Sequence, residues 1–138
     1  MNEMHVMVVD DETIVCDRLK EHLEKAGATV ETFTESAKAL ESLDTMRYDV
    51  VVTDLKMAGP TGLDVLHNVK ERGLSTQVII ITGYGSFEAA REAEAVGAFD
   101  FLCKPLSMKE LTKKVKRAAK KAKHTTDLGG DSESGTRS

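Results

Sequence analysis

The sequence VVVTD occupies residues 50–54 and indicates how the rest of the chain folds. Three consecutive valines that lead into a carboxylate are typical of a strand covered on both faces and ending at a polar edge. Similar apolar runs, MVV at 7–9 and VIII at 78–81, precede and follow it in the chain. Unbroken runs of this kind favour central strands of a parallel sheet, because a strand with one wet face alternates apolar and polar residues.

Five segments in all have the composition of short strands, and their first residues are 20 to 28 positions apart. They are 5–9, 29–33, 49–53, 77–82 and 99–103. Apolar residues recur between them at helical spacing, as in the sets Val15, Leu19, Leu23 and Ala37, Leu40, Leu43. A fifth helix begins at a capping box formed by Ser107 and Glu110. Strict alternation of strand and helix predicts an α/β doubly wound parallel sheet.

The composition agrees with one cytoplasmic domain. A chain of 138 residues and 15.1 kDa, 41% hydrophobic and 30% charged, is ordinary for a single globular domain. Its longest apolar runs are far too short to span a bilayer, and its first residues lack the basic start of a signal peptide. Cys16 and Cys103 have no metal-binding or disulfide spacing, so we expect reduced core thiols.

The net charge of −4 hides a strongly basic segment. Residues 109–123 contain eight basic side chains and one acidic side chain, whereas residues 1–108 contain ten basic and nineteen acidic ones. We expect the solvated face of a terminal helix, with contact to a partner protein as the second interpretation. Direct contact with nucleic acid is not expected, because this segment has no aromatic residue and no second helix to read a groove. Residues 124–138 have the composition of a disordered tail or linker.

Functional side chains follow the predicted strands at their carboxyl ends. Asp10 and Asp11 follow the first strand, Asp54 the third, and Lys104 the fifth, while Thr82 ends the fourth. Parallel strands of such a sheet bind ligands at this edge. Three neighbouring carboxylates repel one another unless a cation is present, and Mg²⁺ is the hard cation that carboxylates and phosphate oxygens hold. Lys104 adds a positive charge for an anion at the same place.

This set of residues, in this order, resembles the receiver domains of bacterial two-component response regulators over roughly residues 4–123. The resemblance implies a flavodoxin-like (βα)5 fold with five parallel strands in the order 2-1-3-4-5, and a receiver domain at 1–123. It also implies that Asp54 is the phosphoacceptor and that Asp10, Asp11 and Asp54 hold Mg²⁺. In the family, the residues at Thr82 and Lys104 bind the phosphoryl group.

Further expectations rest on the same resemblance. Thr82 and Phe101 are the switch residues of a readout surface formed by the fourth helix, fifth strand and fifth helix. Lys56 and Tyr84 occupy positions that set the lifetime of the phosphoryl group. The Lys104–Pro105 peptide bond is cis in the family. The usual proline four residues after the phosphoacceptor is Ala58 here, with a proline at residue 60, so the path of this loop is left open.

The function implied is that of a signalling switch and not of an enzyme with an external substrate. A sensor histidine kinase or phosphotransfer protein would be the phosphodonor, and an output domain or downstream protein the target. A dimer that forms on phosphorylation is compatible with this function. No membrane partner is expected.

Other classes of protein fit the residues less well. Haloacid-dehalogenase-type phosphatases also form an aspartyl phosphate, but their D-x-D-x-T pattern meets Glu12 and Ile14 here. A dinucleotide site would need a third glycine where Glu88 stands, and a flavodoxin would need hydroxyls instead of carboxylates after the first strand.

Overall fold

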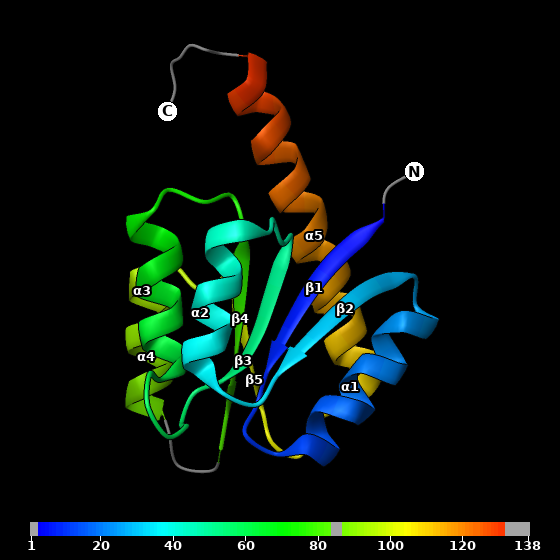
Figure 1. The fold of residues 1–138 in the computed structure, drawn as a ribbon, viewed down its shortest axis with the longest axis vertical. Helices are drawn as coiled ribbons and strands as arrows, with labels where there is room; N and C mark the ends of the chain where they lie inside the picture. Colours follow the sequence, from blue (N-terminus) through cyan, green and yellow to red (C-terminus); the bar gives the residue numbers. More distant parts are fainter. Residues whose placement is uncertain (1–2, 84–86, 132–138) are drawn as a thin grey trace.

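Five parallel strands form one sheet in the order β2-β1-β3-β4-β5, as predicted. The computed structural model describes residues 3–83 and 87–131. The strands are β1 (Met4–Val9), β2 (Ala28–Phe33), β3 (Val50–Asp54), β4 (Gln77–Thr82) and β5 (Asp100–Cys103). The helices are α1 (Thr13–Lys25), α2 (Ser36–Thr45), α3 (Gly62–Glu71), α4 (Phe87–Val96) and α5 (Met108–Asp131). All four strand pairs are parallel, so every carboxyl end points to the same edge (Figure 1).

Helices cover both faces of the sheet and make a three-layer structure (Figure 1). One hydrophobic core lies beneath α1 and α5, where Leu19 and Leu111 meet the even-numbered side chains of β1 and β3. The second core lies beneath α2, α3 and α4 and contains Tyr48 and Leu66. Strand β3 is buried along its whole length, which explains its unbroken valines.

Side-chain caps fix the first turns of two helices near the carboxyl edge. The Thr61 hydroxyl accepts the Asp64 N–H at 3.3 Å, and the Asp64 carboxylate accepts the Thr61 N–H at 2.8 Å, a capping box at the start of α3. The predicted cap at Ser107 is present, since its hydroxyl accepts the Glu110 N–H at 3.2 Å. These bonds hold the loops after β3 and β5 in place.

The last helix is longer than the sequence predicts. The sequence predicts that the folded domain ends at residue 123 and that a disordered tail or linker follows, whereas α5 continues to Asp131. A helix that is already nucleated gains one hydrogen bond for each residue added, and no proline stops it here. Residues 124–131 of the predicted tail or linker are thus part of helix α5. Residues 132–138, the rest of that prediction, lie outside the described residues.

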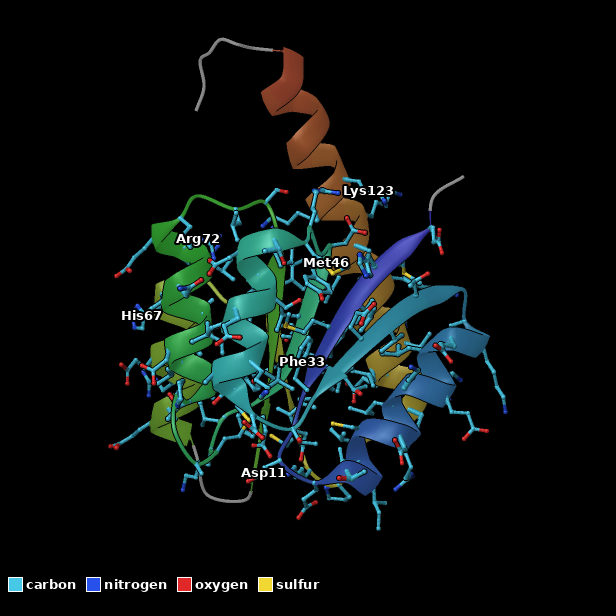
Figure 2. All side chains as sticks on the ribbon, viewed as in Figure 1. Asp11, Phe33, Met46, His67, Arg72 and Lys123 are labelled. Carbon is cyan, nitrogen blue, oxygen red and sulfur yellow. The ribbon has the colours of Figure 1, made fainter. Side chains whose placement is uncertain are left out.

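An ionic cluster closes the opposite, amino-terminal edge of the sheet. The carboxylate of Asp49, whose side chain is 3% exposed, accepts the backbone N–H of His5 at 2.9 Å. It also lies 3.3 Å from the guanidinium of Arg47 and 3.5 Å from the ammonium of Lys123. Lys123 is at this edge in Figure 2, and α5 extends beyond it in Figure 1. The cluster thus joins β1, the start of β3 and α5.

Among the residues that the structure describes, no helix combines the length and the apolar character needed to cross a membrane.

Candidate functional site

Three aspartates meet at the carboxyl edge of the sheet, as the sequence predicts. Oxygen atoms of Asp10, Asp11 and Asp54 all lie within 4.8 Å of one another. Asp10 and Asp54 are buried at the ends of neighbouring strands, whereas Asp11 is exposed at the outer rim, as Figure 2 shows. Three carboxylates this close repel one another strongly in a partly dry site.

Asp10 shows the effect of this crowding most clearly. Its Oδ1 accepts the Glu12 N–H at 2.8 Å, but its buried Oδ2 has no hydrogen-bond partner within the described part of the chain. The pKa of Asp10 is raised to about 6, mainly by burial. The charges of Asp54 and Asp11 also raise it, whereas the Glu12 N–H bond and the charge of Lys104 lower it. A buried carboxylate that has one unpartnered oxygen and lies beside two other carboxylates suits a divalent cation.

Asp54 has a cationic partner in Lys104. The Lys104 ammonium donates to Asp54 Oδ2 at 2.9 Å, and the Asp54 side chain is 10% exposed. The other oxygen, Oδ1, accepts the Lys56 N–H at 3.2 Å. The bond to Asp54 raises the pKa of Lys104, so this side chain is a fixed positive charge at neutral pH. A dianion attached to Asp54 would meet that charge directly.

Thr82 lies at the same edge but faces a neighbour that the sequence analysis did not consider. Its hydroxyl donates to Cys103 Sγ at 3.6 Å, across the β4–β5 register pair formed by these two residues. Thr82 is 2% exposed, and its carbonyl accepts the Lys104 N–H at 2.9 Å. The Thr82 side chain therefore has a hydrogen-bond partner before any ligand arrives.

The prediction that both cysteines are core thiols is half right. Cys16 is buried and donates to the Asp10 carbonyl at 3.3 Å, so it supports the backbone of the carboxylate cluster. Cys103 is exposed, at the last residue of the edge strand β5. Both thiols are free.

Gly62 supports the site in a way that its sequence position alone does not explain. A Cβ atom added there would lie 2.5 Å from the Asp54 carbonyl oxygen and 3.0 Å from Leu55 Cα. The Gly62 N–H also donates to the Leu55 carbonyl at 3.0 Å. Only a glycine lets α3 start this close to β3. The sequence signal that bears on it is the capping pair Thr61 and Asp64, which marks the start of α3.

The remaining predicted residues lie around this centre. Phe101 is half-buried and packs on the core beneath α2, α3 and α4. The Lys56 side chain is exposed, and its contact with Asp54 is made by its backbone. Tyr84 lies outside the described residues. The Lys104–Pro105 peptide bond is cis, as expected, and the loop through Ala58 and Pro60 turns at Gly59, which has a φ of 79°.

Comparison with known proteins identifies one family. The sequence profile of the response regulator receiver domain matches residues 6–116. The chain is 33% identical to the transcriptional regulatory protein QseB of Escherichia coli O157:H7, over 78% of this chain and 49% of QseB. It is 39% identical to the DNA-binding transcriptional regulator NtrC of Escherichia coli K12, over 82% of this chain and 24% of NtrC. The chain thus spans about half or less of the length of these two relatives.

Solved structures give the same result. A receiver domain protein from Clostridium thermocellum superposes with a TM-score of 0.82 at 32% identity, covering 88% of this chain and 98% of that protein. A structure of FixJ-N superposes with a TM-score of 0.80 at 32% identity, covering 87% of this chain and 96% of that one.

Proposed function

The chain belongs to the response regulator receiver family, and on this premise we propose that Asp54 accepts a phosphoryl group from a histidine kinase or a phosphotransfer protein. One observation carries the assignment to Asp54. It is the carboxylate that contacts Lys104 at 2.9 Å and also belongs to the cluster with Asp10 and Asp11. Asp10 is excluded as the acceptor because it is only 1% exposed. Asp11 is excluded because none of the ion pairs among the described residues joins it to a cation, whereas Asp54 is joined to Lys104.

The transfer proceeds by nucleophilic attack of an Asp54 carboxylate oxygen on phosphorus. The phosphorus–nitrogen bond of the donor phosphohistidine breaks, its electron pair stays on the imidazole, and an acyl phosphate forms. Asp54 needs no general base, because a carboxylate already carries the electron pair that attacks. Lys104 stabilises the charge of the phosphoryl oxygens during transfer and afterwards.

Mg²⁺ is the cofactor that this cluster fits. Asp10, Asp11 and Asp54 would hold it, and the unpartnered Oδ2 of Asp10 supports this choice. When bound, the ion neutralises the carboxylates and the phosphoryl oxygens that approach them. The Cys16 thiol and the Glu12 N–H keep the Asp10 backbone and carboxylate in position for this role.

The output is a conformational switch. We assign the phosphoryl hydrogen bond to the Thr82 hydroxyl, which must leave Cys103 to make it. Phe101 then rotates into the space that Thr82 vacates, and the surface formed by α4, β5 and α5 changes. Lys56 and Tyr84 adjust how long the acyl phosphate survives.

A receiver of this kind is a signalling domain that catalyses its own phosphorylation and dephosphorylation, without turnover of an external substrate. Its target is an output domain or a downstream protein, and phosphorylation-dependent dimerisation is compatible with the readout surface. The chain needs no membrane partner for any of these steps.

Intact-mass spectrometry after incubation with Mg²⁺ and acetyl phosphate tests the proposal. We expect a gain of one phosphoryl group that requires the metal and disappears in Asp54→Asn. Asp44→Asn is the matched control, because Asp44 is exposed on α2 and pairs with Arg72. Incorporation that persists in Asp54→Asn, or that is lost in Asp44→Asn as well, contradicts the assignment. If acetyl phosphate gives no incorporation, phosphotransfer from a phosphorylated histidine protein is the second test.

A further inference from the structure

We propose that the outer face of α5 is a docking surface for an acidic helix of a protein partner. Five exposed basic residues form this face, which we call the basic stripe: Lys109, Lys113, Lys116, Arg117 and Lys120. The inference concerns a surface that takes no part in phosphoryl transfer. It rests on the proposed function, because α5 belongs to the readout surface, and it names the kind of partner that this surface binds. Peptide binding and phosphoryl incorporation are measured separately, so failure of the inference is distinguishable from failure of the proposed function.

Helical geometry places the five side chains together. The four lysines follow one another at steps of four, three and four residues, which an α-helix brings to one side. Leu111, Val115 and Ala118 are fully buried on the opposite side, against the sheet. The stripe therefore points away from the body of the protein and runs for about 16 Å along the helix.

The body of the protein does not use these charges. Three other basic residues of α5 do have partners: Lys114 lies 2.6 Å from Asp100, Lys121 lies over the Phe99 ring, and Lys123 contacts Asp49. By contrast, no member of the basic stripe forms an ion pair with a side chain that the structure describes, in residues 3–83 and 88–123. The helix thus has one basic edge that secures it to the sheet and a second basic face that is left for another molecule.

The charge of the whole protein favours a protein segment over a nucleic acid as the molecule that binds the basic stripe. Residues 1–108 carry nineteen acidic and ten basic side chains. Helix α1 packs beside α5 and exposes Asp17. Its Glu21 and Glu24 pair with Lys25 and Lys20, so the repulsion of an anion comes from the net negative charge of the body as a whole. A duplex is anionic along its whole length and would meet this repulsion, whereas a short acidic helix touches only the stripe. Residues 109–123 also have no aromatic side chain on which single-stranded bases could stack.

The spacing of the stripe defines the partner further. A helix with carboxylates at positions i, i+4, i+7 and i+11 repeats the spacing of the four lysines, so two such helices can lie side by side with every charge opposed. Single exposed ion pairs contribute little, but a row of four that forms together gives measurable and salt-dependent binding.

Fluorescence anisotropy with a dye-labelled helical peptide tests the inference. The probe carries glutamates at i, i+4, i+7 and i+11 in an alanine-rich sequence, and a second peptide of equal composition spreads them around the helix. We expect the striped peptide to bind at least fivefold more tightly at about 50 mM salt. The double variant Lys113→Glu/Lys116→Glu should weaken binding at least tenfold, which corresponds to about 1.4 kcal/mol.

The control variant makes the same change in net charge elsewhere. Lys25→Glu/Lys38→Glu alters exposed lysines of α1 and α2 and should change binding less than twofold. Equal loss in both double variants would mean that net charge alone attracts the peptide, and the proposal would be wrong. It would also be wrong if a 20-base-pair duplex bound more tightly than the peptide and lost its affinity in Lys113→Glu/Lys116→Glu.

Discussion

Lys104 and Asp54 are fifty residues apart in the chain, and their side chains meet at 2.9 Å between Nζ and Oδ2. Two different strand ends supply them, so the contact exists only when β3, β4 and β5 are paired in the observed order. The fold thereby ties the proposed phosphoacceptor to the charge that would stabilise its product.

Replacing Lys104 by glutamine should slow phosphorylation by acetyl phosphate about 100-fold, because one preformed charged donor to the transferring group is lost. Mass spectrometry over time measures the rate. Lys114→Gln removes a lysine paired with Asp100 instead and should leave the rate within twofold. Equal rates for wild-type and Lys104→Gln would show that the ion pair has no part in transfer.

The raised pKa of Asp10 predicts a pH-dependent stability in metal-free protein. The folded-state pKa of about 6 exceeds the ordinary value of 3.8, so the folded protein keeps a proton that the unfolded chain has lost. This contribution is fully present below about pH 4 and is lost as the pH rises through 6. A shift of this size corresponds to about 3 kcal/mol in the free energy of unfolding.

Urea unfolding in the presence of EDTA measures this effect as the difference between wild-type and Asp10→Asn. We expect the stability of wild-type relative to Asp10→Asn to fall by about 2 kcal/mol from pH 4.5 to 7.5. Saturating Mg²⁺ should abolish most of that fall, since a bound cation compensates the ionised carboxylate. A constant difference across this range would contradict the effect of burial on Asp10.

Gly62→Ala should destabilise the protein by about 1–3 kcal/mol, because its methyl group would lie 2.5 Å from the Asp54 carbonyl oxygen. Gly83→Ala is the control, since a Cβ there meets nothing within 4 Å, and we expect a change below about 0.5 kcal/mol. Thermal or urea unfolding compares the two. Similar losses in both variants would mean that helix α3 is not held by close approach to β3.

Cys103 should hold the Thr82 hydroxyl in the unphosphorylated protein. Cys103→Val removes the acceptor and should speed phosphorylation by acetyl phosphate about two- to fivefold, while Cys103→Ser offers a stronger acceptor and should slow it. The opposite signs are the diagnostic feature, and unfolding experiments check that both variants are folded. Changes in the same direction would show that the Thr82–Cys103 bond does not restrain the switch.

Most of the fold follows from local patterns in the sequence. The strand predicted from the unbroken valines of β3 is present and buried, and Leu19 and Leu23 lie in the core as their helical spacing predicts. These predictions are confirmed because burial on one or both faces selects for apolar residue types. The second helix was harder to orient. Ala37 was expected to face the core but is exposed, and Ser36 and Ala39 are buried instead, since small residues do not distinguish the two faces.

The sequence predicts which residues meet at the carboxyl edge of the sheet. It does not predict the individual contacts that these residues make there. The convergence of Asp10, Asp11, Asp54 and Lys104 follows from parallel strands alone. The Thr82–Cys103 bond depends on the register of β4 and β5, which the sequence does not specify. The role of Gly62 depends on a distance between two backbones, and no side-chain pattern encodes that distance.

Helix α5 has a mechanical consequence for signalling. Lys123 is secured to Asp49 at 3.5 Å, and beyond it the helix continues to Asp131, about 12 Å farther along its axis. If phosphorylation tilts α5 about this contact, the helix would act as a lever. A tilt too small to disturb the packing of Val115 would then displace Asp131 in proportion to its distance from Lys123.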